Sequence, residues 1–140
     1  MRLLDVNVLV FTVNSDATQH ALAAQAFRES YTRGKVGLPW AVLLGFLRVC
    51  TRPGILARPL TVLQALDTMN RWLEHDDTVL LAPTPRHASI VSRLLIGAGQ
   101  AGNLVPDAHL AALAIEHDAE LISFDRDFAR FAGLRWSMPE

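Results

Sequence analysis

The stretch PDAHLAALAIEHDAELISFD, residues 106–125, holds the pattern that decides the fold. Pro106 is typical of a first helical turn, and the run rich in Ala and Leu after it predicts a helix from Asp107 to about His117. The apolar run Glu120–Ser123 then predicts a short strand, and Asp125 follows it. A helix that leads into a short apolar strand is the repeating unit of α/β domains, so this stretch predicts that class.

The same alternation of short apolar strands and longer helical patterns extends over the rest of the chain. We expect further strands at Leu3–Leu4, Val36–Leu38, Val79–Ala82 and Leu134–Trp136. We expect further helices at His20–Arg33, from Pro39 to about Cys50, after a capping box at Thr61 and Gln64, after an N-cap at Thr84, and as a short turn at Phe128–Phe131. The prediction is a three-layer α/β domain with a mostly parallel central sheet flanked by helices.

Length and composition describe a single domain with a sizeable core. The chain has 140 residues, 51% of them hydrophobic and 19% charged, which excludes a disordered chain and predicts one domain over residues 1–140. A formal net charge of −1 argues against a general polyanion binder, and the single cysteine, Cys50, excludes an internal disulfide. Apolar runs are too short to span a membrane, so we expect a soluble, cytoplasmic protein without a membrane partner.

Three aspartates stand where the predicted sheet brings them together. Asp5 directly follows the first strand, Asp125 follows the Glu120–Ser123 strand, and Asp107 lies in the first turn of a helix. In a parallel sheet all three lie at the edge where strand carboxyl ends meet, which is where such folds bind ligands. Carboxylate oxygens favour Mg²⁺ or Mn²⁺ over zinc, and such an ion activates water for attack on a phosphate. Asn7 and Asp127 are auxiliary candidates, two residues beyond two of these acids.

Each aspartate also has a purely structural interpretation. Asp107 near a helix start is favourable for the helix dipole, and Asp125 with Asp127 fits a polar turn that caps the following helix. Asp5 is harder to explain in this way, because Leu4 and Val6 flank it in an apolar run. The functional hypothesis therefore rests on the three acids coinciding at one edge of the sheet.

Motifs of several other enzyme classes are absent from the chain. There is no P-loop sequence, and the glycines Gly97, Gly99 and Gly102 do not follow a strand as a dinucleotide fingerprint requires. Gly45 belongs to no nucleophile elbow, and the five histidines lack the spacing of metal ligands.

Several segments together resemble a PIN-domain ribonuclease toxin of the VapC type, from a bacterial toxin–antitoxin pair. They are LLDVNVLV (3–10), LPWAVLLGFLRVCTRPGI (38–55), LAPTPRHASIVSRLL (81–95), GNLVPDAHLAALAIEHDAELISFDRDFARF (102–131) and GLRW (133–136). The resemblance covers nearly the whole chain and implies a PIN-like fold. It also implies a Mg²⁺- or Mn²⁺-dependent endoribonuclease, active on RNA and neutralised by a cognate antitoxin, with a homodimer and a toxin–antitoxin hetero-oligomer as assemblies.

The resemblance assigns roles to individual residues. Asp5, Asp107 and Asp125 match the family's acidic positions, which implies that they are the catalytic residues and the metal ligands. Asn7 matches the position where small polar residues follow the first acid. Candidates for binding RNA phosphates are the arginines expected near the site, Arg48, Arg52, Arg86 and Arg126.

One position departs from the family pattern. Most PIN domains carry a further acid in the helix after the second strand, and here Gly45 stands about where that acid is expected. No acid lies between Glu29 and Asp67, so no neighbour replaces it. We therefore expect one firmly held metal ion, with a second bound weakly or only with substrate.

Two alternatives to the nuclease follow from the same residues. A haloacid-dehalogenase-like phosphatase also begins with a strand and an Asp, but Asn7 replaces its second Asp and Lys35 is the only lysine. The other alternative is a PIN-fold module that binds RNA or a partner with weak or lost catalysis. The three remaining acids favour the nuclease over this second alternative.

Overall fold

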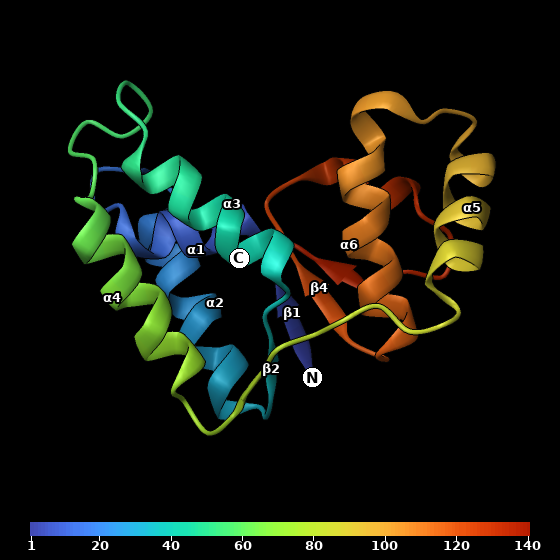
Figure 1. Cartoon of the computed structure of the whole chain (residues 1–140), viewed down its shortest axis with the longest axis horizontal. Coiled ribbons are helices and arrows are strands. Elements are labelled where there is room, and N and C mark those ends of the chain that lie inside the picture. Colours follow the sequence, from blue (N-terminus) through green and yellow to red (C-terminus); the bar gives the residue numbers. More distant parts are fainter.

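The computed structural model describes all 140 residues as five parallel strands between two groups of helices (Figure 1). The strands are β1 (Arg2–Leu4), β2 (Val36–Gly37), β3 (Thr78–Val79), β4 (Glu120–Ile122) and β5 (Trp136–Ser137). The helices are α1 (Val6–Val13), α2 (His20–Thr32), α3 (Trp40–Thr51), α4 (Val62–Leu73), α5 (His87–Ala98) and α6 (Val105–Glu116), with 3₁₀ helices η1 (Gly102–Leu104) and η2 (Arg126–Arg130). No helix is both long and apolar enough to cross a membrane.

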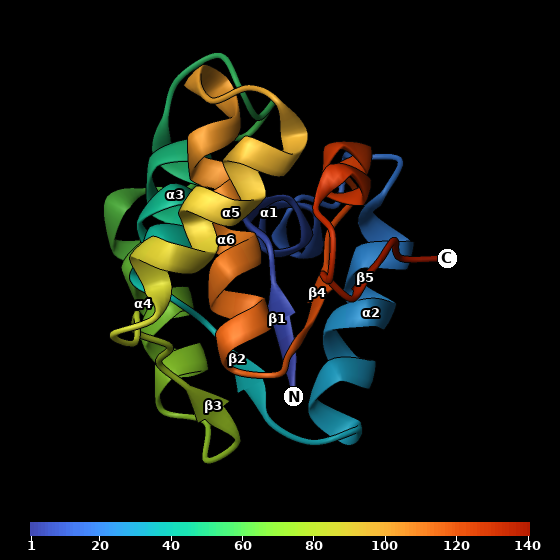
Figure 2. The same cartoon turned by 90° about the vertical axis from the view of Figure 1, so that its right-hand side faces the viewer.

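The sheet has the strand order β3-β2-β1-β4-β5, and helices cover both of its faces. Helices α1 to α4 lie on one side of the strands and α5 and α6 on the other (Figure 1), and Figure 2 views the domain from the α5–α6 side. The predicted three-layer α/β architecture is confirmed. The chain winds outward from β1 to β3 and then crosses to β4 on the other side of β1. The topological switch point, where such sheets bind ligands, therefore lies between β1 and β4.

Helix α1 is an element that the sequence pattern did not predict. Its residues 6–13, VNVLVFTV, are rich in β-branched side chains that favour strands. Asp5 nevertheless begins a helix there, because its side chain accepts a hydrogen bond from the Val6 amide as an N-cap. Val8, Leu9 and Val10 are buried, and the helix packs against α2 and α3. Tertiary packing therefore outweighs the local preference for a strand.

Helix α5 begins at His87, three residues later than the predicted N-cap at Thr84. The Thr84 amide and hydroxyl both donate to the Glu116 carboxylate, at 3.1 and 3.2 Å, which ties Thr84 to α6. Thr84 Oγ also accepts from the Arg86 amide at 3.2 Å, so it holds the turn that leads into α5. The Glu116 side chain is fully buried and also contacts His87 Nδ1 at 3.1 Å, while His87 Nε2 lies 2.8 Å from His109 Nδ1. This polar cluster joins α5 to α6. At α4 the predicted capping box of Thr61 and Gln64 is confirmed.

Candidate metal centre

The pairing of β1 with β4 brings the first predicted acid to the switch point. Leu4 pairs with Ile122 in register, and the Asp5 amide donates to the Ile122 carbonyl at 3.0 Å. Asp5 and Ser123 are consequently the first residues beyond two neighbouring strand ends. Asp125, two residues further along, is the N-cap of η2, and its side chain accepts from the Asp127 amide at 2.8 Å.

Ser123 and Asn7 fix the orientation of the Asp5 carboxylate. Ser123 Oγ donates to Asp5 Oδ2 at 2.6 Å, and Asn7 Nδ2 donates to the same oxygen at 2.9 Å. The Val6 amide donates to Asp5 Oδ1 at 2.7 Å, so both carboxylate oxygens are held by donors. Asn7 Oδ1 in turn accepts from the Phe124 amide at 3.2 Å, which ties α1 to the segment after β4. Asn7 therefore positions Asp5.

Ser123 is a site residue that sequence reasoning missed. The prediction placed it in the strand, whereas the strand ends at Ile122 and the Ser123 side chain turns toward Asp5. Its Oγ also accepts from the Asp125 amide at 3.0 Å, so one hydroxyl links two of the acids. The only signal in the sequence was a polar residue at the end of an apolar strand, whereas its full burial beside the strand that carries Asp5 is seen only in the structure.

Asp107 reaches the same edge from the opposite layer, at the start of α6. Together with Asp127 and Arg130 it lines an open cavity of about 540 Å³, beside the 100–104 loop. Asp127 and Arg130 form an exposed ion pair with 3.6 Å between Asp127 Oδ1 and Arg130 Nε. Burial and the charges of Asp125, Asp5 and Asp127 raise the pKa of Asp107 to about 6. Asp5, Asp125 and Asp127 therefore all lie near enough to Asp107 for their charges to raise its pKa.

The chemistry of this cluster fits a hard divalent cation. Burial raises the pKa of Asp5 above its usual range, hydrogen bonds from Ser123 and Val6 oppose that rise, and the charge of Asp125 adds to it. Mutually repelling carboxylates with oxygen donors only are the ligand set that Mg²⁺ and Mn²⁺ prefer. As they stand, no three His, Cys, Asp or Glu side chains converge tightly enough to hold an ion directly.

The four predicted phosphate-binding arginines lie in different places. Arg126 follows Asp125 in η2 and is exposed at the cluster. Arg48 and Arg52 are exposed on the second half of α3 and at its C-cap, and neither forms an ion pair. Arg86 donates to the Glu116 carbonyl at 3.3 Å, at the end of α6 that lies opposite Asp107. The structure therefore does not bring Arg86 to the carboxylates, while Arg130, which was not predicted, is there.

Gly45 lies against the residue that follows Asp5. A Cβ atom at Gly45 would approach Val6 Cγ2 to 2.7 Å, a distance that real contacts do not reach. Val6 is β-branched and has little rotamer freedom in a helix, so it cannot easily move aside. The position where the family pattern expects an acid is thus filled by close packing of α3 on α1.

The chain is similar to characterised proteins over nearly its full length. A family model described as PIN domain matches residues 2–134. The chain is 41% identical to ribonuclease VapC37 of Mycobacterium tuberculosis, covering 99% of this chain and 97% of that protein. It is 40% identical to ribonuclease VapC33 of the same organism, covering 96% and 95%.

Two solved structures share the fold. VapBC2 from Rickettsia felis, bound to a DNA fragment from their promoter, has a chain that matches with a TM-score of 0.72 at 16% identity, covering 99% of this chain and 98% of that one. FitAB bound to an IR36 DNA fragment also has a TM-score of 0.72 at 16% identity, covering 99% and 95%. With a matching family model over residues 2–134 and relatives at 40% identity or more, the chain belongs to the PIN-domain family.

Proposed function

We propose that this protein is the toxin of a toxin–antitoxin pair, an endoribonuclease that cleaves RNA phosphodiester bonds in the cytoplasm with Mg²⁺ or Mn²⁺. The relatives at 41% and 40% identity are named ribonucleases of the VapC type and match almost end to end. Identity at that level over a full domain supports a shared activity when the site is also present. The haloacid dehalogenase alternative loses its support, because the chain belongs to the PIN-domain family.

The observation that carries the proposal is the gathering of Asp5, Asp107 and Asp125 from three separate segments of the chain. Structural roles explain parts of it, since Asp5 and Asp125 are N-caps and Asp107 lies in a first helical turn. Those roles do not require the acids to lie near one another, yet burial together with the charges of Asp125, Asp5 and Asp127 raises the pKa of Asp107 to about 6. A site that holds uncompensated carboxylates together at a cost in stability is typical of a functional centre.

We assign the residues as follows. Asp5, Asp107 and Asp125 hold the ion, and Asp127 supports Asp107 and Asp125 from the rim of the cavity. A bound divalent cation lowers the pKa of water and neutralises charge on the phosphate under attack. Ser123 and Asn7 keep the Asp5 oxygens in one orientation, which is the preorganisation that such a site needs.

The arginines at the cluster bind the RNA backbone. Arg126 and Arg130 are exposed on η2, next to Asp125 and Asp127 in the chain, which supports a role for them in holding RNA phosphates. Arg48 and Arg52 contact a longer substrate from α3. Single-stranded RNA is the expected target because its bases and backbone are accessible.

A cognate antitoxin and a second copy of the chain are the proposed protein partners. Helix α4 exposes three large apolar side chains in adjacent turns, Val62 at 67%, Leu63 at 75% and Leu66 at 37%. Exposed apolar patches of this kind mark interaction surfaces in soluble proteins. We propose a homodimer whose toxin–antitoxin hetero-oligomer covers such surfaces and silences the site.

A variant series tests the proposed function. Purified, antitoxin-free protein is incubated with labelled single-stranded RNA and Mn²⁺, and Asp5→Asn and Asp125→Asn are compared with Asp67→Asn. Asp67 is exposed on α4 and takes part in no ion pair, so its variant removes one charge away from the cluster. We expect cleavage by the wild type and the control, and loss in the two cluster variants. Undiminished cleavage by Asp5→Asn contradicts the proposal, and binding of RNA without cleavage by the wild type indicates the non-catalytic alternative.

A further inference from the structure

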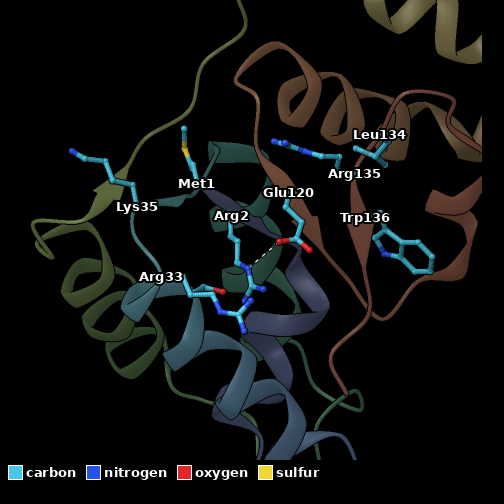
Figure 3. A pocket seen from close by; sticks show the side chains of 9 residues that line it. Met1, Arg2, Arg33, Lys35, Glu120, Leu134, Arg135 and Trp136 are labelled. Carbon is cyan, nitrogen blue, oxygen red and sulfur yellow. Dashed lines mark hydrogen bonds and ion pairs between the residues drawn. The ribbon is translucent and has the colours of Figure 1, made fainter.

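A second cavity, of about 570 Å³, lies at the opposite edge of the sheet from the carboxylates. We call it the amino-edge cavity, since residues at the start of neighbouring strands line it. Lys35 precedes β2, Arg2 and Glu120 open β1 and β4, and Arg135 precedes β5 (Figure 3). Because β1 has only three residues, about 10 Å of strand separates this edge from the metal centre.

Its lining is cationic although the chain as a whole has a net charge of −1. A single carboxylate, Glu120, is accompanied by four cationic side chains, Arg2, Arg33, Lys35 and Arg135. Both Glu120 oxygens are already engaged, by Arg2 Nε at 3.1 Å and by Ser137 Oγ at 2.7 Å. The cavity therefore retains an excess of positive charge after its internal pairing.

Arg2 is the best placed of these cations to bind an anion. Its side chain is only 14% exposed, and Nε is the one guanidinium nitrogen that donates to the protein. The remaining N–H groups are left for a ligand, in surroundings where charge-assisted hydrogen bonds are strong. Lys35 is exposed and forms no ion pair.

Two acids outside the lining compensate the other cations only weakly. Glu29 lies 3.8 Å from Arg33, and Asp118 lies 2.8 Å from Arg135 with a side chain that is 93% exposed. Ion pairs so exposed to solvent contribute little, so an anionic ligand competes with them readily. Arg135 Nη2 also donates to the Asp118 carbonyl at 2.6 Å, which leaves the other N–H groups of Arg135 for the ligand.

An apolar wall completes the cavity. Leu134 and Trp136 line it beside the cations, and the Trp136 indole N–H donates to the Ser123 carbonyl at 3.1 Å, which holds the ring in place. Fixed aromatic rings next to arginines are the recurring platform on which proteins stack a nucleobase while binding its phosphate. The cavity volume lies within the range of small-molecule sites.

We propose that the amino-edge cavity binds a nucleotide, with its phosphate against Arg2, Lys35 and Arg135 and its base against Trp136. The nucleotide is either free or one unit of an RNA strand, since both present the same phosphate and base. The site opens at the other edge of the sheet from the metal centre, is joined to it by the hydrogen bond from Trp136 to Ser123, and does not depend on cleavage.

Titration followed by ¹H–¹⁵N NMR tests the proposal. The Asp5→Asn protein in EDTA, which keeps RNA intact and removes divalent cations, receives AMP, a 5′-phosphorylated RNA tetranucleotide or inorganic phosphate. The three tryptophan indole signals are monitored, and Trp136→Phe assigns the relevant one. We expect the Trp136 signal to move with AMP if the free nucleotide is the ligand, or with the tetranucleotide alone if the strand is.

Variants in the same background separate this site from general charge attraction. Lys35→Ala/Arg135→Ala weakens nucleotide binding at least about tenfold. Arg28→Ala/Arg71→Ala removes the same charge from exposed positions outside the cavity and leaves binding unchanged. If the first double variant unfolds, Lys35→Ala alone replaces it. The proposal is overturned if neither nucleotide ligand moves the Trp136 signal, if inorganic phosphate moves it as far as AMP does, or if the cavity variant binds like its parent.

Discussion

Replacing Asp107 by Asn separates what the acidic cluster costs in stability from what it contributes to activity. In EDTA no cation offsets the burial and the charges of Asp125, Asp5 and Asp127, which together raise the pKa of Asp107 from 3.8 to about 6. At 1.36 kcal/mol per unit this shift corresponds to about 3 kcal/mol of unfolding free energy at neutral pH. Asp107 is only partly buried, so solvent screening reduces the figure to about 1.5 kcal/mol. The variant also lacks the negative charge that stabilises the first turn of α6, which lowers its stability by about 0.5 kcal/mol.

We therefore expect the free energy of unfolding of Asp107→Asn to exceed that of the wild type by about 1 kcal/mol at pH 8 in EDTA, which raises Tm by about 3 °C. The sign depends on pH in a defined way. The pKa of Asp107 is higher in the folded protein than in the unfolded chain. The charged carboxylate therefore costs the wild type no stability below about pH 4, and the wild type loses stability as the pH rises through about 6. The gain of the variant should accordingly vanish at pH 4, where both proteins are uncharged at this position.

Urea unfolding at pH 8 and pH 4, with circular dichroism as the readout, measures this difference directly. Asp67→Asn is the control and should change stability by less than about 0.5 kcal/mol at either pH. In the presence of Mn²⁺, Asp107→Asn should also lose RNA cleavage. A variant that is less stable than the wild type at pH 8 would contradict this expectation, because burial and the neighbouring acids would then not be disfavouring the charged Asp107 carboxylate.

Three further predictions concern the packing around the site and between α5 and α6. Ser123→Ala removes the donor at 2.6 Å from Asp5 Oδ2, and should lower RNA cleavage at least about tenfold. It should also lower the free energy of urea unfolding by about 1–2 kcal/mol. The control Ser92→Ala, at an exposed position, should change neither RNA cleavage nor stability. Gly45→Ala should lower Tm, because its Cβ would clash with Val6. Gly97→Ala has nothing within 4 Å of its Cβ and should raise stability by up to about 1 kcal/mol. Equal effects of the two variants in thermal melts would contradict close packing at Gly45. His87→Ala removes a donor from the buried Glu116 carboxylate and should lower the free energy of unfolding in urea by about 1–3 kcal/mol. If this variant is as stable as the wild type, the cluster does not join α5 to α6.

The sequence predicted the architecture better than the details of the site. Alternating strands and helices were enough for the three-layer sheet, because short apolar runs after helices leave few other arrangements. Helix α1 was missed since its β-branched residues favour a strand, and only packing on α2 and α3 makes it helical. The later start of α5 was missed because Thr84, which also binds the distant Glu116, holds a turn over Pro85 and Arg86 before the helix begins.

The three aspartates were predictable because strand ends and a helix start are local features. Ser123 was not, since its role depends on the register that places Leu4 beside Ile122. Arg86 was expected at the site on its position in the chain, but its guanidinium donates to a carbonyl at the far end of α6. The missing acid at Gly45 was visible in the sequence, whereas the reason, contact with Val6, required the structure.

The dependence of RNA cleavage on divalent cations decides whether the carboxylate cluster is a catalytic metal centre. The purified, antitoxin-free wild-type protein is incubated with a labelled single-stranded RNA in EDTA, and excess Mn²⁺ is then added to the same sample. We expect no products in EDTA and internal cleavage after Mn²⁺ is added, with Asp5→Asn inactive throughout. Cleavage at the same rate before and after the addition would contradict this expectation, because Asp5, Asp107 and Asp125 would then have no part in holding a catalytic ion.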